Sequence, residues 1–166
     1  ADLQSRERIT KLCMKSGRLY EALYHLIEFE KLMKLKSRSM YLMKSGEIQF
    51  RKASVFQSII DFYIGIASHK KEKDRVVNMG RLHSFIYRFN IDNKAFKITP
   101  LTGTGPLQIN KTLGSLISAA NVYYAQAADN QKFRQRYKAY YCMARNNMFR
   151  DKIKVAIQNL QKALET

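Results

Sequence analysis

The side chains best suited to acid–base or metal chemistry are three histidines, and none has a neighbour at the spacing of a metal site. His25, His69 and His83 stand in separate segments, and no HExxH-type pattern surrounds them. Arg18 precedes His25 by seven residues, which loosely resembles the Arg–His pair of some helical ribonucleases. A chain with 30 Lys and Arg residues contains such pairs by chance, so this spacing is weak evidence. We keep a ribonuclease only as an alternative. The TGTG sequence at 102–105 follows no predicted strand, so we interpret it as a turn rather than a phosphate-binding loop.

Cysteines and carboxylates offer no clearer site. Cys13 and Cys142 are too few for a disulfide framework or a cysteine-based zinc site. In a secreted chain they could pair with each other, and otherwise both are free, so the sequence leaves both states open. No pair of carboxylates recurs at helical spacing in an apolar setting. We therefore expect a protein that is not an enzyme and that uses no cofactor and no metal.

The charge of the chain points to an anionic partner. There are 30 Lys and Arg residues and 13 Asp and Glu residues, a formal net charge of +17. Residues 1–83 carry 17 basic and 9 acidic side chains and residues 84–166 carry 13 and 4, so the surplus is +8 and +9. Because the charge is not confined to a tail, the folded body itself is cationic. Nucleic acid, an anionic membrane surface and a negatively charged glycoprotein coat all fit such a surface.

Two basic clusters are the candidate contacts with an anionic surface. The first comprises Lys31, Lys34, Lys36, Arg38, Lys44, Arg51 and Lys52. The second comprises Lys132, Arg134, Arg136, Lys138, Arg145, Arg150, Lys152 and Lys154. Its interleaved aromatics, our candidate interfacial residues, are Phe133, Tyr137, Tyr140, Tyr141 and Phe149. Basic residues alternating with aromatics suit single-stranded nucleic acid, on which bases stack, and equally a membrane interface. A third interpretation is a solvated helix face whose aromatics lie in the core.

Helices must carry these clusters, because apolar residues recur at helical spacing along most of the chain. The helical segments are 18–36, 47–68, 76–89, 110–128, 132–145 and 149–164. Ser68 is a plausible N-cap for a helix that starts in the polar run 69–75 and leads into the third segment. Asn110 or Thr112 should cap the fourth segment, and Asp129–Asn130 should end it. Both prolines fall in the sequence TPLTGTGP at 99–106, which predicts a loop. Two prolines and seven glycines are too few for a β-sandwich, so we expect an all-α, up-down bundle of five to six helices.

Membrane crossing is not expected from the sequence. The longest nearly apolar stretch, 55–67, has 13 residues and contains Asp61, so it is too short and too polar to cross a bilayer. The chain begins at Ala1 without Met, as a mature secreted chain does after signal cleavage. A sequence whose first residues were removed for another reason would begin in the same way, so the start is compatible with secretion but does not require it.

Several segments resemble a known family. They are Val77-Asn78 through Ile98, the TPLTGTGP loop, Thr112-Leu113-Gly114-Ser115-Leu116-Ile117 and Tyr123-Tyr124. In this order they resemble the gastropod sperm acrosomal proteins, the family of abalone lysin and its paralogue, the fusagenic sperm protein. In lysin, too, a helix with a Val-Asn step leads into a Gly/Thr/Pro loop, and a Leu-Gly-x-x-Ile helix then ends in an aromatic pair. The resemblance covers about 38–149.

This resemblance implies a lysin-like fold and a role at fertilisation. Members are secreted from the sperm acrosomal vesicle as basic, all-α monomers or dimers without an active site. Lysin binds an egg-envelope glycoprotein and loosens its fibres without cleaving a bond, whereas the paralogue promotes fusion of sperm and egg membranes. Our chain has no Trp, whereas lysin has several, and it continues past Phe149. It also carries an N-terminal extension, 1–37, with an amphipathic helix, before a bundle domain, 38–166.

These departures favour the fusagenic branch of the family. We therefore expect a protein that binds anionic gamete membranes and promotes their fusion, with a homodimer as one compatible state. Lysin-like, stoichiometric dissolution of the egg vitelline envelope is the first alternative. An intracellular helical nucleic-acid-binding protein is the second, because a surplus of positive charge also suits phosphates.

Overall fold

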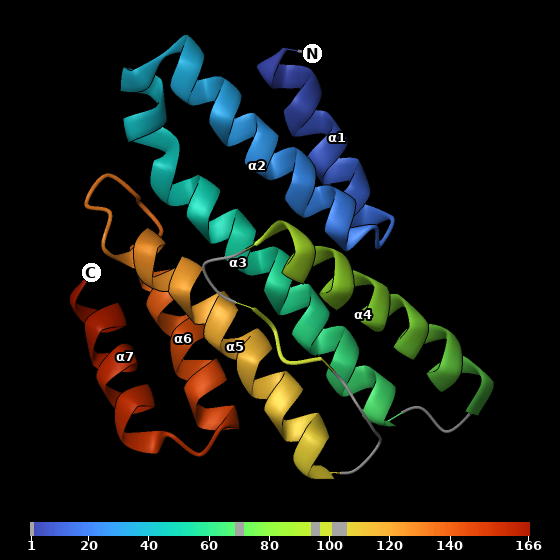
Figure 1. Ribbon diagram of the computed structural model, residues 1–166. Coiled ribbons are helices and arrows are strands. Elements are labelled where there is room, and N and C mark those ends of the chain that lie inside the picture. The colour runs from blue at the N-terminus through green and yellow to red at the C-terminus, as the bar shows by residue number, and fades with distance from the viewer. Residues whose placement is uncertain (1, 69–71, 94–96, 101–105) are drawn as a thin grey trace.

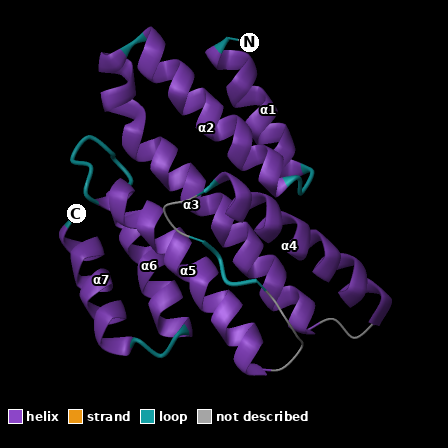
Figure 2. Ribbon diagram, in the orientation of Figure 1, coloured by secondary structure: helices purple, strands orange, loops and turns teal. Residues whose placement is uncertain are grey.

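The computed structural model of the protein describes residues 2–68, 72–93, 97–100 and 106–166, and these form helices and no strands (Figure 2). The helices are α1 (Leu3–Lys15), α2 (Leu19–Lys36), α3 (Arg38–Ser68), α4 (Glu72–Asp92), α5 (Pro106–Ala128), α6 (Arg136–Phe149) and α7 (Ile153–Glu165). The prediction of an all-α protein is confirmed. Seven helices stand where five to six were expected, and α1 is the one for which the sequence analysis proposed no element.

The longest helix, α3, lies at the centre of the bundle. Its 31 residues span about 46 Å at 1.5 Å per residue, and it contacts α2, α4 and α5. The remaining helices pack outward from this centre, with α1 on α2, α6 on α5 and α7 on α6. Helices α1 to α4 alternate in direction, and so do α5 to α7, but α4 and α5 run the same way, so the predicted up-down order fails at this one step (Figure 1).

The described part of the predicted N-terminal extension, residues 2–37, shares the core of the bundle. Cys13 of α1 and Leu23 of α2 belong to the same buried cluster as Phe56 of α3. A second buried cluster joins Leu26, Phe29 and Met33 of α2 to Ile48 of α3. The boundary drawn at residue 37 therefore coincides with the turn between α2 and α3, and apolar packing continues across it.

Two helix ends are closed by a residue in the left-handed conformation. Gly17 follows α1 with φ of 74°, and the N–H of Arg18 donates to the carbonyl of Cys13 at 2.9 Å. Asp151 follows α6 with φ of 58°, and the next N–H donates to a carbonyl inside α6 at 2.8 Å. Both are Schellman motifs, in which glycine is favoured because it has no Cβ. They fold α2 back onto α1 and α7 back onto α6.

Some predicted boundaries were right and others were wrong. α5 ends at Ala128, directly before Asp129–Asn130, as predicted. Its predicted start was wrong, because α5 begins at Pro106 and therefore already includes Asn110 and Thr112. Residues 132–135 are not helical, because Phe133 packs closely on Gly46 of α3, where an added Cβ would lie 2.5 Å from the Phe133 Cβ. In the predicted loop at 99–106, residues 99–100 are irregular, and 101–105 lie outside the described residues. The prediction of Ser68 as an N-cap was wrong, because Ser68 is the last residue of α3 and α4 begins at Glu72.

Candidate functional site

Ion pairs neutralise much of the first basic cluster, which lies on α2 and α3. The guanidinium of Arg51 lies 3.1 Å from the Glu7 carboxylate and 2.7 Å from the Glu47 carboxylate. Burial alone would raise the pKa of Glu7, but the hydrogen bond and charge of Arg51 outweigh it and lower that pKa. Lys31 pairs with Glu28 at 3.3 Å. The positive charges of Arg51 and Lys31 are therefore matched within the molecule.

Lys52 is a core residue, which corrects its prediction as a surface contact. Its side chain is only 8% exposed, and its Nζ lies 3.0 Å from Oε1 of Glu30. Gln49 donates to the other oxygen of Glu30 at 2.8 Å, and Lys34 lies 3.8 Å from Oε1. The Tyr123 ring faces the Lys52 ammonium at 5.6 Å. Helical spacing puts Lys52 on the side of α3 that meets α2, so this cation serves packing.

The remaining three cations of this cluster surround the turn between α2 and α3. Lys36, Arg38 and Lys44 form no ion pair with any residue that the structure describes. Ser37 begins α3 as its N-cap, since its hydroxyl accepts from an N–H of the first turn at 3.3 Å. Leu35 is 85% exposed beside them. Further exposed apolar residues are Met40, Leu42 and Met43. We call residues 35–44 the α2–α3 corner.

The second basic cluster is unpaired throughout. None of its eight cations forms an ion pair within the described ranges, because the C-terminal half of the chain holds only four acidic residues. Two of the eight are held by hydrogen bonds instead. Arg136 donates to the carbonyl of Ala128 at 2.6 Å, and Arg150 donates to the Ser118 hydroxyl at 3.5 Å. All but the half-buried Arg136 are exposed.

Two of the five candidate interfacial aromatics lie in the core instead. Phe133 is buried against Phe50, with ring centroids 5.6 Å apart. Tyr140 is buried too, with the Lys162 ammonium 5.8 Å from its ring. These two predictions were wrong, because Phe133, in the turn before α6, packs on α3, and Tyr140 lies on the side of α6 that meets α7. The three aromatics that are exposed, as predicted, are Tyr137, Tyr141 and Phe149.

An exposed apolar stripe on α7 was not predicted as functional. Ile153, Ile157 and Leu164 lie within about 40° of one another around the helix, at 100° per residue. All three are exposed, and Leu164 is 89% exposed. Buried Ala156 marks the side that faces the bundle, and it lies to one side of the stripe. The spacing of these residues in the sequence could have shown that they share one side of a helix. That this side is exposed follows from the packing of α7, which lies mainly against α6.

Buried amides fix α6 and α7 against the bundle. Asn146 of α6 donates to Asn121 of α5 at 3.0 Å, and Asn147 donates to Asn159 of α7 at 2.9 Å. Buried amides need such partners, since an unsatisfied one costs about 1–3 kcal/mol. This set of hydrogen bonds determines which side of α7 faces inward and therefore which side stays exposed.

The predicted Arg–His pair does not form a ribonuclease-like site. The guanidinium of Arg6, not Arg18, donates to Nδ1 of His25 at 2.9 Å. Burial and the charge of Arg6 lower the pKa of His25, so its imidazole is neutral at pH 7. His83 is exposed, and His69 lies outside the described residues. In the described part of the chain, no three His, Cys, Asp or Glu residues gather as metal ligands would.

Both cysteines are free. Cys13 of α1 is buried in the main hydrophobic core, and Cys142 of α6 is half-buried. Burial raises the pKa of the Cys142 thiol, and the thiol form is a poor nucleophile. The alternative that the sequence left open is therefore resolved in favour of two unbridged thiols.

Comparisons with known proteins add no relative to this description. No protein-family model, characterised protein or solved structure matches the chain. Among the described residues, no helix is long and apolar enough to span a bilayer. Inferences about function therefore start from the surface itself.

Proposed function

We propose that this protein acts at fertilisation without catalysing a reaction, by binding anionic gamete membranes and promoting their fusion, and that it is secreted from the sperm acrosomal vesicle. The observation that carries the proposal is the exposure of large apolar side chains next to unpaired cations, at the α2–α3 corner and on α6 and α7. The gamete setting comes from the sequence resemblance, and membrane binding comes from this surface.

Both the unpaired cations and the exposed apolar side chains favour binding to an anionic lipid membrane. A Lys or Arg near an anionic membrane contributes about 1 kcal/mol, so Lys36, Arg38 and Lys44 together supply about 3 kcal/mol. An exposed Leu or Ile gains about 1.5–3 kcal/mol when fully removed from water. Leu35 and Leu164 are the most exposed of these residues. Cations attract the protein to the membrane, and the apolar side chains then insert at the acyl boundary.

The position of the two regions suits contact with two membranes. In Figure 1 the α2–α3 corner and the turn between α6 and α7 lie at opposite ends of the molecule. Each end carries its own cations and its own exposed apolar side chains. A rigid body with an adhesive surface at each end can hold two bilayers close together, which is the first requirement of fusion.

The type of exposed apolar residue argues against nucleic acid. Single-stranded nucleic acid is bound by aromatic rings on which bases stack, and two of the five candidate rings are buried. The exposed residues beside the cations are largely aliphatic, such as Leu35, Met43, Ile153 and Leu164. Aliphatic side chains offer no stacking surface to a base but partition readily into lipid.

A dye-dilution assay of lipid mixing tests the proposal. Vesicles of phosphatidylcholine with and without phosphatidylserine are mixed with the wild-type protein and with the double variant Ile153→Ser, Leu164→Ser. Tyr87→Ser, Ile91→Ser is the matched control on α4, since Ile91 is 58% exposed and Ile153 is 59% exposed. We expect the α7 variant to need at least about tenfold more protein, which corresponds to about 1.4 kcal/mol. The control should stay within about twofold of the wild type.

Other outcomes assign the alternatives. No lipid mixing at micromolar protein, or equal mixing with neutral and anionic vesicles, contradicts the proposal. Release of glycoprotein from isolated vitelline envelopes, without new peptide ends, would assign lysin-like activity. Binding to single-stranded nucleic acid whose log affinity falls linearly with log salt concentration would assign the third function.

A further inference from the structure

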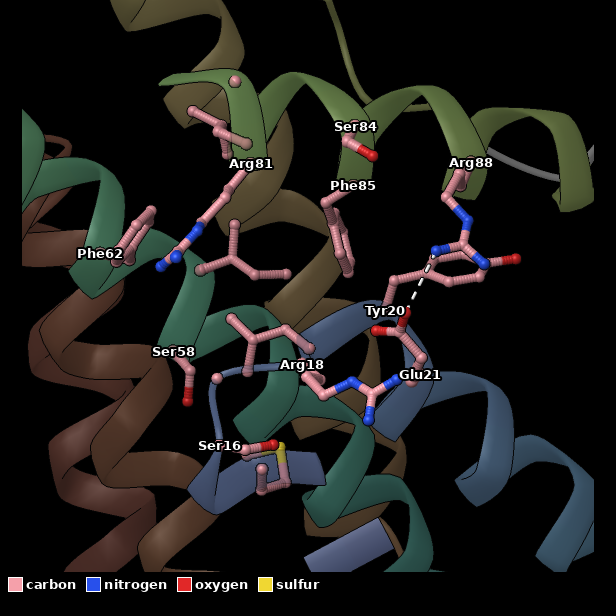
Figure 3. A pocket seen from close by; sticks show the side chains of 16 residues that line it. Ser16, Arg18, Tyr20, Glu21, Ser58, Phe62, Arg81, Ser84, Phe85 and Arg88 are labelled. Carbon is pink, nitrogen blue, oxygen red and sulfur yellow. Dashed lines mark hydrogen bonds and ion pairs between the residues drawn. The ribbon is translucent and has the colours of Figure 1, made fainter. Parts of the chain in front are cut away.

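A pocket of about 760 Å³ lies between the α1–α2 turn, α3 and α4, and no residue of either basic cluster lines it. Its apolar lining is Met14, Leu19, Ile59, Phe62, Leu82 and Phe85. Serine hydroxyls from three parts of the chain, Ser16, Ser58 and Ser84, also border it (Figure 3). Its volume is within the range of about 300–1,000 Å³ typical of small-molecule sites.

The charged residues of this pocket leave it positive. Three guanidinium groups and one carboxylate line it, those of Arg18, Arg81, Arg88 and Glu21, a net charge of +2. Arg88 lies 3.3 Å from Glu21 and 4.0 Å from the centre of the Tyr20 ring. The guanidinium groups of Arg18 and Arg81 form no ion pair or hydrogen bond with the residues that the structure describes. The single acid is therefore occupied, and two arginines stay available for an anion.

Local structure places these arginines around one space. The Schellman turn at Gly17 brings Arg18 to the edge of the pocket at the start of α2. On α4, Arg81 and Arg88 are seven residues apart, so they share one face of the helix. In Figure 3 Arg81 reaches from α4 toward Phe62 of α3, over the apolar lining.

We infer that this pocket binds a single-chain amphiphile, with its anionic head group on Arg81 and its apolar chain on the lining between α3 and α4, while Arg18 adds positive charge at the opposite side of the pocket (Figure 3). A guanidinium presents a planar fork of donors that matches a carboxylate or a phosphate. A free inorganic anion would leave the apolar lining uncovered, and an uncharged chain would leave Arg81 unpaired. This site is independent of the membrane-binding surface, so the failure of either proposal leaves the other intact.

Calorimetric titration with soluble probes tests the inference. Decanoate and decyl phosphate carry both required features, whereas inorganic phosphate lacks the chain and decyltrimethylammonium has the wrong charge. We expect saturable, one-to-one binding of at least one of the first two probes, and binding of the other two at least tenfold weaker. Equal binding of inorganic phosphate and decyl phosphate, or of the cationic probe and decanoate, would overturn the inference.

Matched variants separate the pocket from the general positive charge. Arg18→Gln, Arg81→Gln should weaken binding at least tenfold, whereas Arg38→Gln, Arg134→Gln removes the same charge outside the pocket and should change it less than twofold. Equal losses would show that binding follows net charge alone and would overturn the inference.

A space-filling variant excludes unfolding as the cause of lost binding. Gly80 lines the pocket on α4, and a Cβ added there would meet nothing within 4 Å. Gly80→Leu should fill the pocket and abolish one-to-one binding, while the melting temperature rises because leucine is the better helix former. Unchanged binding in this variant would contradict the proposed site.

Discussion

The buried ion pair of Lys52 and Glu30 predicts unequal costs for removing its two members. Glu30→Ala would leave the Lys52 ammonium without a carboxylate, in a side chain that is only 8% exposed. Lys52→Met would leave Glu30 with Lys34 at 3.8 Å and with the donated hydrogen bond of Gln49 at 2.8 Å. The carboxylate therefore keeps two partners, whereas the buried ammonium keeps only the Tyr123 ring face at 5.6 Å among these contacts.

The magnitudes follow from this asymmetry. Breaking a buried pair by removing one partner costs about 3–5 kcal/mol, so we expect Glu30→Ala to lower the free energy of unfolding by about 4 kcal/mol. Lys52→Met should lower it by about 1–2 kcal/mol, because hydrogen bonds to a charged group each retain about 1.5–3 kcal/mol. The double variant Glu30→Leu, Lys52→Met should lie within about 1 kcal/mol of the wild type, since apolar replacement of a buried pair is often neutral.

Urea unfolding followed by far-UV circular dichroism measures these differences. Lys31→Met is the control, because its pair with Glu28 is exposed and such pairs contribute about 0–1 kcal/mol. A cost for Lys52→Met as large as that for Glu30→Ala would refute the asymmetry. A Glu30→Ala cost below about 1 kcal/mol would show that the ammonium reaches water, contrary to the burial described.

Three further predictions concern backbone geometry and one histidine. Asp151→Gly should raise the free energy of unfolding by about 0.5–1 kcal/mol, because a left-handed non-glycine residue is strained; a lower melting temperature would contradict this. Gly46→Ala should lower the free energy of unfolding by about 1–3 kcal/mol, because the added methyl group pushes Phe133 away. Gly80→Ala is its control, since the added methyl group meets nothing within 4 Å, and it should raise the free energy of unfolding by about 0.5–1 kcal/mol in the same urea experiment. The pKa of His25 lies below its ordinary 6.5 when the protein is folded, so its neutral form stabilises the fold above that pH, and this contribution falls as the pH drops through the lowered pKa. His25→Gln should therefore lose less stability than the wild type between pH 7.5 and about pH 5, and equal losses would assign the pH effect to other groups.

Periodicity predicted helices well where a local signal also marked their ends. α2 and α5 end close to the expected places, the latter before Asp129–Asn130. The sequence failed at 132–135, where apolar spacing suggested helix. There a contact 87 residues distant in sequence, between Phe133 and Gly46, holds the chain in a turn. No short-range pattern carries information about such a contact.

On the candidate surface, too, the sequence showed which residue types are present but not which of them are exposed. The sequence located both basic clusters but assigned all fifteen cations one role. In the structure Lys52 is buried against Glu30, whereas Lys44 is exposed and forms no ion pair with the described residues. The two differ only in which side of α3 they occupy and in which helix covers that side.

By itself, the sequence determined the properties that are sums or short-range patterns. The net charge of +17 counts every side chain wherever it lies, and helical periodicity depends on neighbours three and four residues away. Only the tertiary structure decided which cations are paired, which rings are buried and that the apolar stripe of α7 is left open. These depend on how helices cross, because an ion pair or a covered face needs partners from segments that are distant along the chain.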